Sequence, residues 1–283
     1  GDVRMIAAAF SFRNKRANAL IGGALMAVIL GAAALALVWT PFDPLGINLR
    51  ARFAAPSPTH LFGADEFGRD VLSRAMAGAL SSTSISFLTV SFAVICGTAI
   101  GVVTGYVRGW TDRAIMTVND ALLAFPGMLL ALGLMAVIGP NRYGIILALG
   151  IAYTPSVVRV VRGTVMSIRE REYVEASRVL GNGELYTMAR HVLPNAIAPI
   201  AVLATSMFGW VILSESALSF LGLGVPPPAP TWGNMLAGSR PFMESAVWLG
   251  IAPGLCIALS LLGINLLGDW LRDRLDPRMA VHA

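Results

Sequence analysis

Residues 170–199 read EREYVEASRVLGNGELYTMARHVLPNAIAP, a polar insert between two strongly apolar segments. The first part predicts a short helix with one apolar and one charged face, because its apolar residues recur at helical spacing. These apolar residues are Tyr173, Ala176, Val179 and Leu180. Residues 181–183, Gly-Asn-Gly, suit a helix end and a sharp reversal, since they tolerate positive φ. A second helix over residues 184–191 then leads to Pro194, which needs no N–H in the first turn of the next apolar helix.

The insert is larger than a connection between two membrane spans needs to be. A folded insert indicates either a partner protein on that side of the membrane or an amphipathic loop that lies on lipid headgroups. The apolar stripe fits both interpretations, so the pattern alone leaves them open.

The composition independently predicts a membrane protein. Hydrophobic residues make up 56% of the chain and charged residues 13%, and the mean hydropathy is +0.70. A soluble domain of this composition lacks the polar residues to cover its surface. The net charge of +5 does not indicate nucleic acid, because the basic residues lie in short stretches between apolar segments. Cys96 and Cys256 each lie inside an apolar segment, which favours packing roles over a disulfide.

Six apolar runs are long enough to cross a hydrocarbon core of about 30 Å. They cover residues 17–39, 80–107, 114–138, 143–161, 195–213 and 247–267. The sequence thus predicts an all-α membrane protein with three parts: residues 1–79 (N-terminal tail, first span and extracytoplasmic segment), residues 80–270 (a core of about five spans) and residues 271–283 (a C-terminal tail). Within these parts we expect an interfacial helix over residues 70–80, with Asp70 and Arg74 paired, and a segment that dips back among the helices over residues 214–246.

Three residues in or beside the spans are candidates for the solute pathway or for helix packing. Asp120 lies inside the third span, where a buried hydrogen bond to a neighbouring helix is favoured over a substrate contact. Pro126, followed by Gly127, should bend or break the same span. Glu215 stands at the start of the irregular segment, and Pro155 is expected to interrupt the fourth span. Neither acid has an obvious basic counterpart within the spans.

The insert resembles the EAA loop of ATP-binding-cassette (ABC) importer permeases. In that family the pattern is E-A-A, three residues, G, nine residues, I, one residue, L-P. Here Glu175-Ala176-Ser177, Gly181 and His191-Val192-Leu193-Pro194 match its spacing, with Ser177 in place of the second Ala and His191 in place of Ile. Residues 190–195 (RHVLPN) are typical of the dipeptide/oligopeptide/nickel branch. Other stretches typical of that branch are residues 60–65 (HLFGAD), 68–74 (GRDVLSR), 124–126 (AFP), 218–224 (LSFLGLG) and 265–273 (NLLGDWLRD).

The resemblance covers roughly residues 20–278. It implies the C-type subunit of a type I ABC importer permease, whose EAA loop carries a coupling helix on the cytoplasmic side. It implies that the chain forms half of a translocation pathway. Its partners would be a second permease chain, two cytoplasmic ABC ATPase subunits and an extracytoplasmic solute-binding protein. No bound cofactor or metal is expected. Di- or oligopeptides are the expected solutes; nickel chelates, glutathione, opines or haem-like ligands are alternatives. The residues implied in ATPase coupling are Glu172, Glu175, Ala176, Ser177, Arg178, Gly181, Leu193 and Pro194. Glu175 is the leading contact residue, whereas Arg171 and Arg178 fit lipid phosphate equally well.

Orientation follows from the basic residues. With six spans, the N-terminal stretch, the 108–113 link, the 159–190 region and the C-terminal stretch share one side of the membrane, and together they hold fifteen of the 21 Lys and Arg residues. The positive-inside bias therefore predicts both termini and the insert in the cytoplasm. With the resemblance, this predicts a multi-pass protein of a bacterial cell membrane, in contact with lipid.

The sequence indicates no enzyme. The single Lys, Lys15, is not part of a phosphate-binding GxxxxGK[ST] loop. The three His residues are far apart in sequence and lack metal-ligand spacing, and no GxSxG elbow occurs. Asp120 and Asp269 form a conceivable carboxylate dyad of an intramembrane protease, but Asp269 is expected to cap a helix beside Arg272. A membrane receptor or scaffold is a further alternative, because bare topology serves either function.

Overall fold

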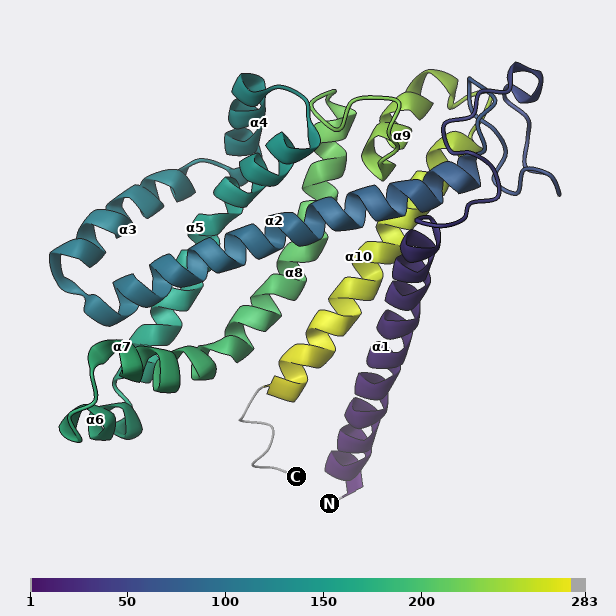
Figure 1. Cartoon of the computed structure of the whole chain (residues 1–283). Coiled ribbons are helices and arrows are strands. Elements are labelled where there is room, and N and C mark those ends of the chain that lie inside the picture. The colour runs from purple at the N-terminus through teal and green to yellow at the C-terminus, as the bar shows by residue number, and fades with distance from the viewer. Residues whose placement is uncertain (1, 276–283) are drawn as a thin grey trace.

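The computed structural model describes residues 2–275, of which residues 2–15 are described by their backbone alone. The described chain is helical over most of its length (Figure 1). Its elements in order are α1 (Asp2–Leu35), η1 (Leu49–Ala51), α2 (Val71–Val107), α3 (Gly109–Ala124), α4 (Gly127–Ile138), α5 (Arg142–Arg169), α6 (Glu172–Val179), α7 (Glu184–Thr187), the π-helical η2 (Met188–Val192), α8 (Leu193–Phe220), α9 (Trp232–Ser239), η3 (Arg240–Phe242) and α10 (Trp248–Leu275).

Five helices in the described part of the chain are long and apolar enough to cross a membrane: α1 from Arg16, α2, α5, the continuous helix Glu184–Phe220, and α10. The pair α3 and α4 makes a sixth span if it is counted as one broken crossing, since the two helices meet at 90°. This agrees with the prediction of about six spans. The break is where Pro126 was expected to produce it: Pro126 has no N–H, and Phe125 before it is extended.

Figure 1 shows that α1 and α10 run side by side, and that the start of α1 and the end of α10 lie at the same end of the bundle as α6 and α7. Residues 36–70, α4 and α9 lie at the other end. The main apolar core joins α2, α4, α5 and α8, and Ile85, Met135, Leu149 and Met207 are among its buried side chains.

Glycines let α2 and α5 approach closely. A Cβ on Gly97 would lie 2.5 Å from the Cβ of Val157, and one on Gly101 would lie 2.7 Å from the Cβ of Val161. Gly105 stands four residues further along α2, where a Cβ would lie 2.8 Å from the carbonyl oxygen of Arg162. Without a water-driven force between spans, such close packing is what holds helices together in lipid.

The structure corrects the expected interfacial helix and its ion pair. Residues 71–80 are the first turns of α2, because Asp70 is the N-cap and the helix continues unbroken to Val107. The Asp70 carboxylate accepts hydrogen bonds from the Ser73 backbone N–H (2.8 Å) and from its hydroxyl, and lies 2.9 Å from Nδ1 of His60. Capping turns this carboxylate back onto its own helix, so Arg74 pairs with Asp65 instead (3.5 Å).

Several helices extend beyond their apolar runs, because backbone hydrogen bonding continues after the hydrophobic residues end. α5 reaches Arg169, and Pro155 lies inside it without ending it, as membrane helices tolerate. α10 reaches Leu275, so Asp269 lies within the helix and is not the cap that was expected. Of the predicted C-terminal tail, residues 276–283 lie outside the described residues.

The segment over residues 214–246 is helical at its start, contrary to expectation. α8 continues to Phe220, so Glu215 lies inside a helix. The chain then forms α9, whose N-cap Thr231 makes a capping box with Asn234. Trp232 is 1% exposed, and its Nε1–H donates to the carbonyl of Ala75 at the start of α2 (3.0 Å). The irregular backbone is therefore anchored within the protein.

Candidate functional site

The predicted insert forms a compact unit of two helices, α6 and α7, which we call the α6–α7 loop (residues 170–194; Figure 1). α6 ends in a Schellman motif: Gly181 has φ +82°, its N–H donates to Arg178 O (2.9 Å), and the Asn182 N–H donates to Ser177 O (3.2 Å). The glycine turn is thus formed as the sequence predicted, since Gly adopts this φ without a clash with its own Cβ.

Ser177 joins the two helices of the loop. It is 4% exposed, and its hydroxyl lies 3.0 Å from the Thr187 hydroxyl on α7. The Asn182 side-chain amide also donates to the Ser177 hydroxyl (3.1 Å). Ser177 stands where the family pattern has its second Ala, and its hydroxyl forms buried hydrogen bonds that connect the two helices. Val174, with no exposed surface, packs into the main core beside it.

Contacts with the end of α2 hold the loop against the membrane helices. Tyr106 donates its hydroxyl proton to Glu184 at the start of α7, and its carbonyl accepts a hydrogen bond from Arg169 at the end of α5. Arg108 and Glu170 form an ion pair of 2.8 Å. These five contact residues are not evident from the sequence, because Tyr106 sits at the end of an apolar run and its partners are 63 and 78 residues away in the chain.

The outer surface of α6 is unoccupied by the rest of the described chain. Glu172, Glu175 and Ala176 are exposed, as are Val179 (82%) and Leu180 (81%). The predicted apolar stripe of α6 therefore faces away from the rest of the protein. The side of α6 that packs against the protein carries Val174 and Ser177. An open groove of about 620 Å³ runs beside this surface, and its lining residues are Arg108, Arg169, Glu170, Glu175, Arg178 and Val179.

The loop connects to α8 without a break. The predicted second helix and the fifth span form one helix from Glu184 to Phe220, interrupted only by the π-helical turn η2. Pro194 lies in the first turn of α8, as predicted. It has no N–H for α-helical bonding, and just before it the Leu193 N–H pairs with Met188 O, one residue further back than in an α-helix. Leu193 and Pro194 are both exposed.

Asp120 has a basic partner that was not foreseen. Its carboxylate accepts a hydrogen bond of 2.7 Å from Arg159 on α5, and the two side chains are 55% and 60% exposed. The expected buried hydrogen bond is therefore an exposed ion pair. Asp112 and Arg162 form a second link between α3 and α5, with two hydrogen bonds of 2.7 Å, and are more buried.

Glu215 is buried where α8 meets α2 and α9. It has no exposed surface and accepts hydrogen bonds from the hydroxyls of Ser219 (2.8 Å) and Ser82 (3.3 Å). Ser82 accepts in turn from the Trp232 N–H (3.2 Å), so Glu215 ties α8 to α2 and α9. Pro126 lies exposed at the break between α3 and α4. The partner that the structure shows for Asp120 is the guanidinium of Arg159 and not a second carboxylate.

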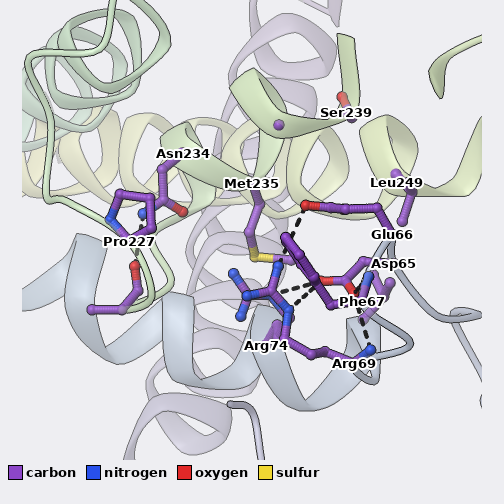
Figure 2. A pocket seen from close by; sticks show the side chains of 13 residues that line it. Asp65, Glu66, Phe67, Arg69, Arg74, Pro227, Asn234, Met235, Ser239 and Leu249 are labelled. Atoms are coloured by element: carbon purple, nitrogen blue, oxygen red, sulfur yellow. Dashed lines mark hydrogen bonds and ion pairs between the residues drawn. The ribbon is translucent and has the colours of Figure 1, made fainter. Parts of the chain in front are cut away.

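A second group of charged residues lies at the opposite end of the molecule (Figure 2). Asp65 accepts a hydrogen bond from Arg69 Nε (2.6 Å), and Arg74 lies 3.5 Å from the same carboxylate oxygen. Together with Met235 and Asn234 of α9 these residues line a cavity of about 250 Å³. Glu66 lies 3.5 Å from Arg69, so the cluster holds two acidic and two basic side chains. Arg74 also donates to the carbonyl of Pro44 (3.0 Å), which secures residues 36–70 to the start of α2.

The fold and the loop define a class: an all-helical, multi-pass membrane protein with a folded two-helix loop at one end. Residues 97–281 match the family model of the binding-protein-dependent transport system inner membrane component. The chain therefore belongs to this family of membrane permeases.

Three comparisons agree. The chain is 40% identical to the dipeptide transport system permease protein of Alkalihalophilus pseudofirmus, over 96% of this chain and 89% of that protein. It is 38% identical to the glutathione transport system permease protein of Escherichia coli O6:K15:H31, over 94% and 89%. Its fold is similar to a chain of the inward-facing MetNI methionine ABC transporter, with a TM-score of 0.59 at 17% identity over 72% of this chain and 96% of that one. The chain is thus an ABC importer permease with the type I fold.

Proposed function

We propose that this permease carries short peptides across the membrane, together with a second permease chain, two cytoplasmic ABC ATPase subunits and an extracytoplasmic solute-binding protein. In this proposal ATP is hydrolysed by the partner subunits, and the α6–α7 loop is the surface on which one ATPase docks. The start of α1 and the end of α10 lie at the same end of the bundle as this loop, which supports a cytoplasmic location for the two termini.

The observation that carries the coupling proposal is the construction of the loop. Its inner side is fixed by Ser177 and Val174, whereas Glu175, Val179 and Leu180 are exposed on its outer side. The loop continues directly into α8 as one helix from Glu184 to Phe220. A movement of a docked ATPase would therefore be passed to a membrane span as the movement of a rigid element.

Glu172, Glu175, Ala176 and Arg178 are assigned here as docking residues, and Ser177, Gly181, Leu193 and Pro194 as residues that hold the loop in shape. In this proposal α6 contacts an ATPase subunit. In the alternative, in which the loop lies on lipid headgroups, α6 contacts lipid.

A photoreactive amino acid at Val179 tests the docking surface in the assembled transporter. We expect it to cross-link to the ATPase subunit, and the same group at Val28 of α1, which is 70% exposed, to give no ATPase adduct. Adducts of the Val179 probe with lipid alone would overturn the proposal.

Short peptides are proposed as solutes because relatives in this family are named for dipeptide and glutathione transport. Glutathione is itself a tripeptide, so it is the second candidate. Uptake of radiolabelled dialanine and of glutathione by cells that express the complete transporter would distinguish the two.

A further inference from the structure

One face of α3 and α5 is polar although both helices belong to membrane-crossing segments. On α3, Arg113, Thr117 and Asp120 are exposed and follow one another at spacings of four and three residues, which places them on a single helix face. On α5, Arg159, Gly163 and Ser167 are exposed at spacings of four. The Asp120–Arg159 ion pair joins the two rows. We call these six residues the α3–α5 stripe.

A lipid-facing helix surface looks different in the same molecule. On α1 every exposed residue from Leu20 to Leu35 is apolar, and the large ones include Leu20, Ile21, Val28 and Leu30. Asp120 lies inside the apolar run 114–138, and its partner Arg159 lies at the end of the run 143–161. Charged groups inside membrane helices face a bundle interior or a water-filled cavity, because exposure to hydrocarbon costs several kcal/mol per charge. The part of the α3–α5 stripe around this pair therefore does not face lipid in the assembled transporter.

The two Arg–Asp pairs between α3 and α5 are built differently. Arg162 donates two hydrogen bonds to the Asp112 carboxylate, and the two side chains are 27% and 11% exposed. This bidentate, half-buried pair suits a structural link. Arg159 makes one hydrogen bond to Asp120, through a single nitrogen to a single oxygen. The other nitrogens of Arg159 and the second oxygen of Asp120 have no partner among the described residues, and more than half of each side chain is exposed. The second pair is thus open to a further ligand.

We infer that the α3–α5 stripe lines a water-filled solute pathway, in which Asp120 and Arg159 bind the charged ends of a zwitterionic solute. A protonated α-amino group would contact Asp120, and a carboxylate would contact Arg159. A zwitterion can exchange with the existing ion pair without leaving a net charge unpaired, so passage past the pair needs no uncompensated charge at membrane depth. This inference rests on the proposed function of the chain as a permease for short peptides.

Water access along the stripe is tested without any solute. In the complete transporter in lipid nanodiscs, with Cys96 and Cys256 replaced by alanine, a single cysteine is introduced as Thr117→Cys or, as the lipid-facing control, as Val28→Cys. A positively charged, membrane-impermeant methanethiosulfonate is added. We expect the Thr117→Cys protein to react at least about tenfold faster than the Val28→Cys protein, because the reagent needs an ionised, hydrated thiol. Equal, slow reaction of the two would overturn the pathway.

The binding role is tested by uptake of dialanine. Asp120→Asn and Arg159→Gln should each lower the maximal uptake rate by about tenfold, as expected for the loss of one charge-assisted hydrogen bond, with protein level and melting temperature retained. The double variant Asp120→Arg, Arg159→Asp restores an ion pair with its charges exchanged. If the pair is only structural, the exchange restores uptake; if it binds solute, uptake stays low.

The two failures are distinguishable. A wild-type transporter that does not take up dialanine, but whose Thr117→Cys variant reacts rapidly, contradicts the proposed solute and leaves the water-filled path intact. Normal dialanine uptake by Asp120→Asn and Arg159→Gln, or its recovery in the exchanged pair, overturns the binding role and leaves the proposed function standing.

Discussion

The hydroxyl oxygens of Ser177 and Thr187 lie 3.0 Å apart in a buried contact between α6 and α7. Because the two residues belong to helices on either side of a glycine turn, this contact sets the angle at which α6 projects from the bundle. The rigidity of the α6–α7 loop therefore depends on a few polar contacts at its base, and its outer surface is free to dock.

The first prediction concerns this contact. Ser177→Ala leaves the Thr187 hydroxyl, which has no exposed surface, without its partner. We expect a loss of about 1–2 kcal/mol in the free energy of unfolding of the loop, measured as faster proteolysis of residues 170–194 in the purified protein. Thr164→Val is the control, because that hydroxyl bonds only to a carbonyl of its own helix. Equal proteolysis of both variants would contradict the role given to Ser177.

The second prediction concerns Gly181, whose φ of +82° is costly for other residues. Gly181→Pro cannot adopt this φ and also removes the N–H that bonds to Arg178 O, so we expect uptake to be lost while membrane insertion is retained. Gly181→Ala should destabilise the loop by about 1–2 kcal/mol, whereas Gly181→Asn should be milder. Gly183→Ala is the matched control, because Gly183 has φ −64° and no atom lies within 4 Å of an added Cβ. Normal uptake by fully expressed Gly181→Pro would refute the coupling mechanism.

The third prediction tests the exposed surface of α6. Glu175→Arg reverses a charge on the proposed docking face without disturbing a buried contact. The protein should insert and melt as the wild type does, while ATP hydrolysis by the complete transporter becomes uncoupled from uptake. Glu244→Arg, a charge reversal at an exposed position between η3 and α10, is the control. If Glu175→Arg supports full uptake, Glu175 is not a docking residue.

The fourth prediction concerns the packing of α2 on α5. Gly101→Ala places a Cβ 2.7 Å from the Cβ of Val161 and 2.9 Å from the carbonyl oxygen of Val158, so the two helices must separate. We expect a destabilisation of about 1–3 kcal/mol, seen as a lower melting temperature in detergent. Gly133→Ala on α4 has nothing within 4 Å of the new methyl group and should melt as the wild type does. Identical melting of the two variants would show that the α2–α5 contact relaxes freely.

Features that depend on local covalent properties were readable from the sequence. The number of spans follows from the length of the apolar runs, and the break before α4 follows from the missing N–H of Pro126. The turn after α6 follows from the conformational freedom of Gly181. Each of these depends on a residue and its immediate neighbours, so no knowledge of packing was needed.

Partners far apart in the chain were set by the tertiary structure alone. Asp120 meets Arg159, 39 residues away, and Tyr106 meets Glu184, 78 residues away, only because α2, α3 and α5 pack in one particular register. The glycines of α2 establish this register by their close contact with Val157 and Val161. Hydropathy along one helix does not contain that information, since it records which residues avoid water and not which neighbouring helix they meet.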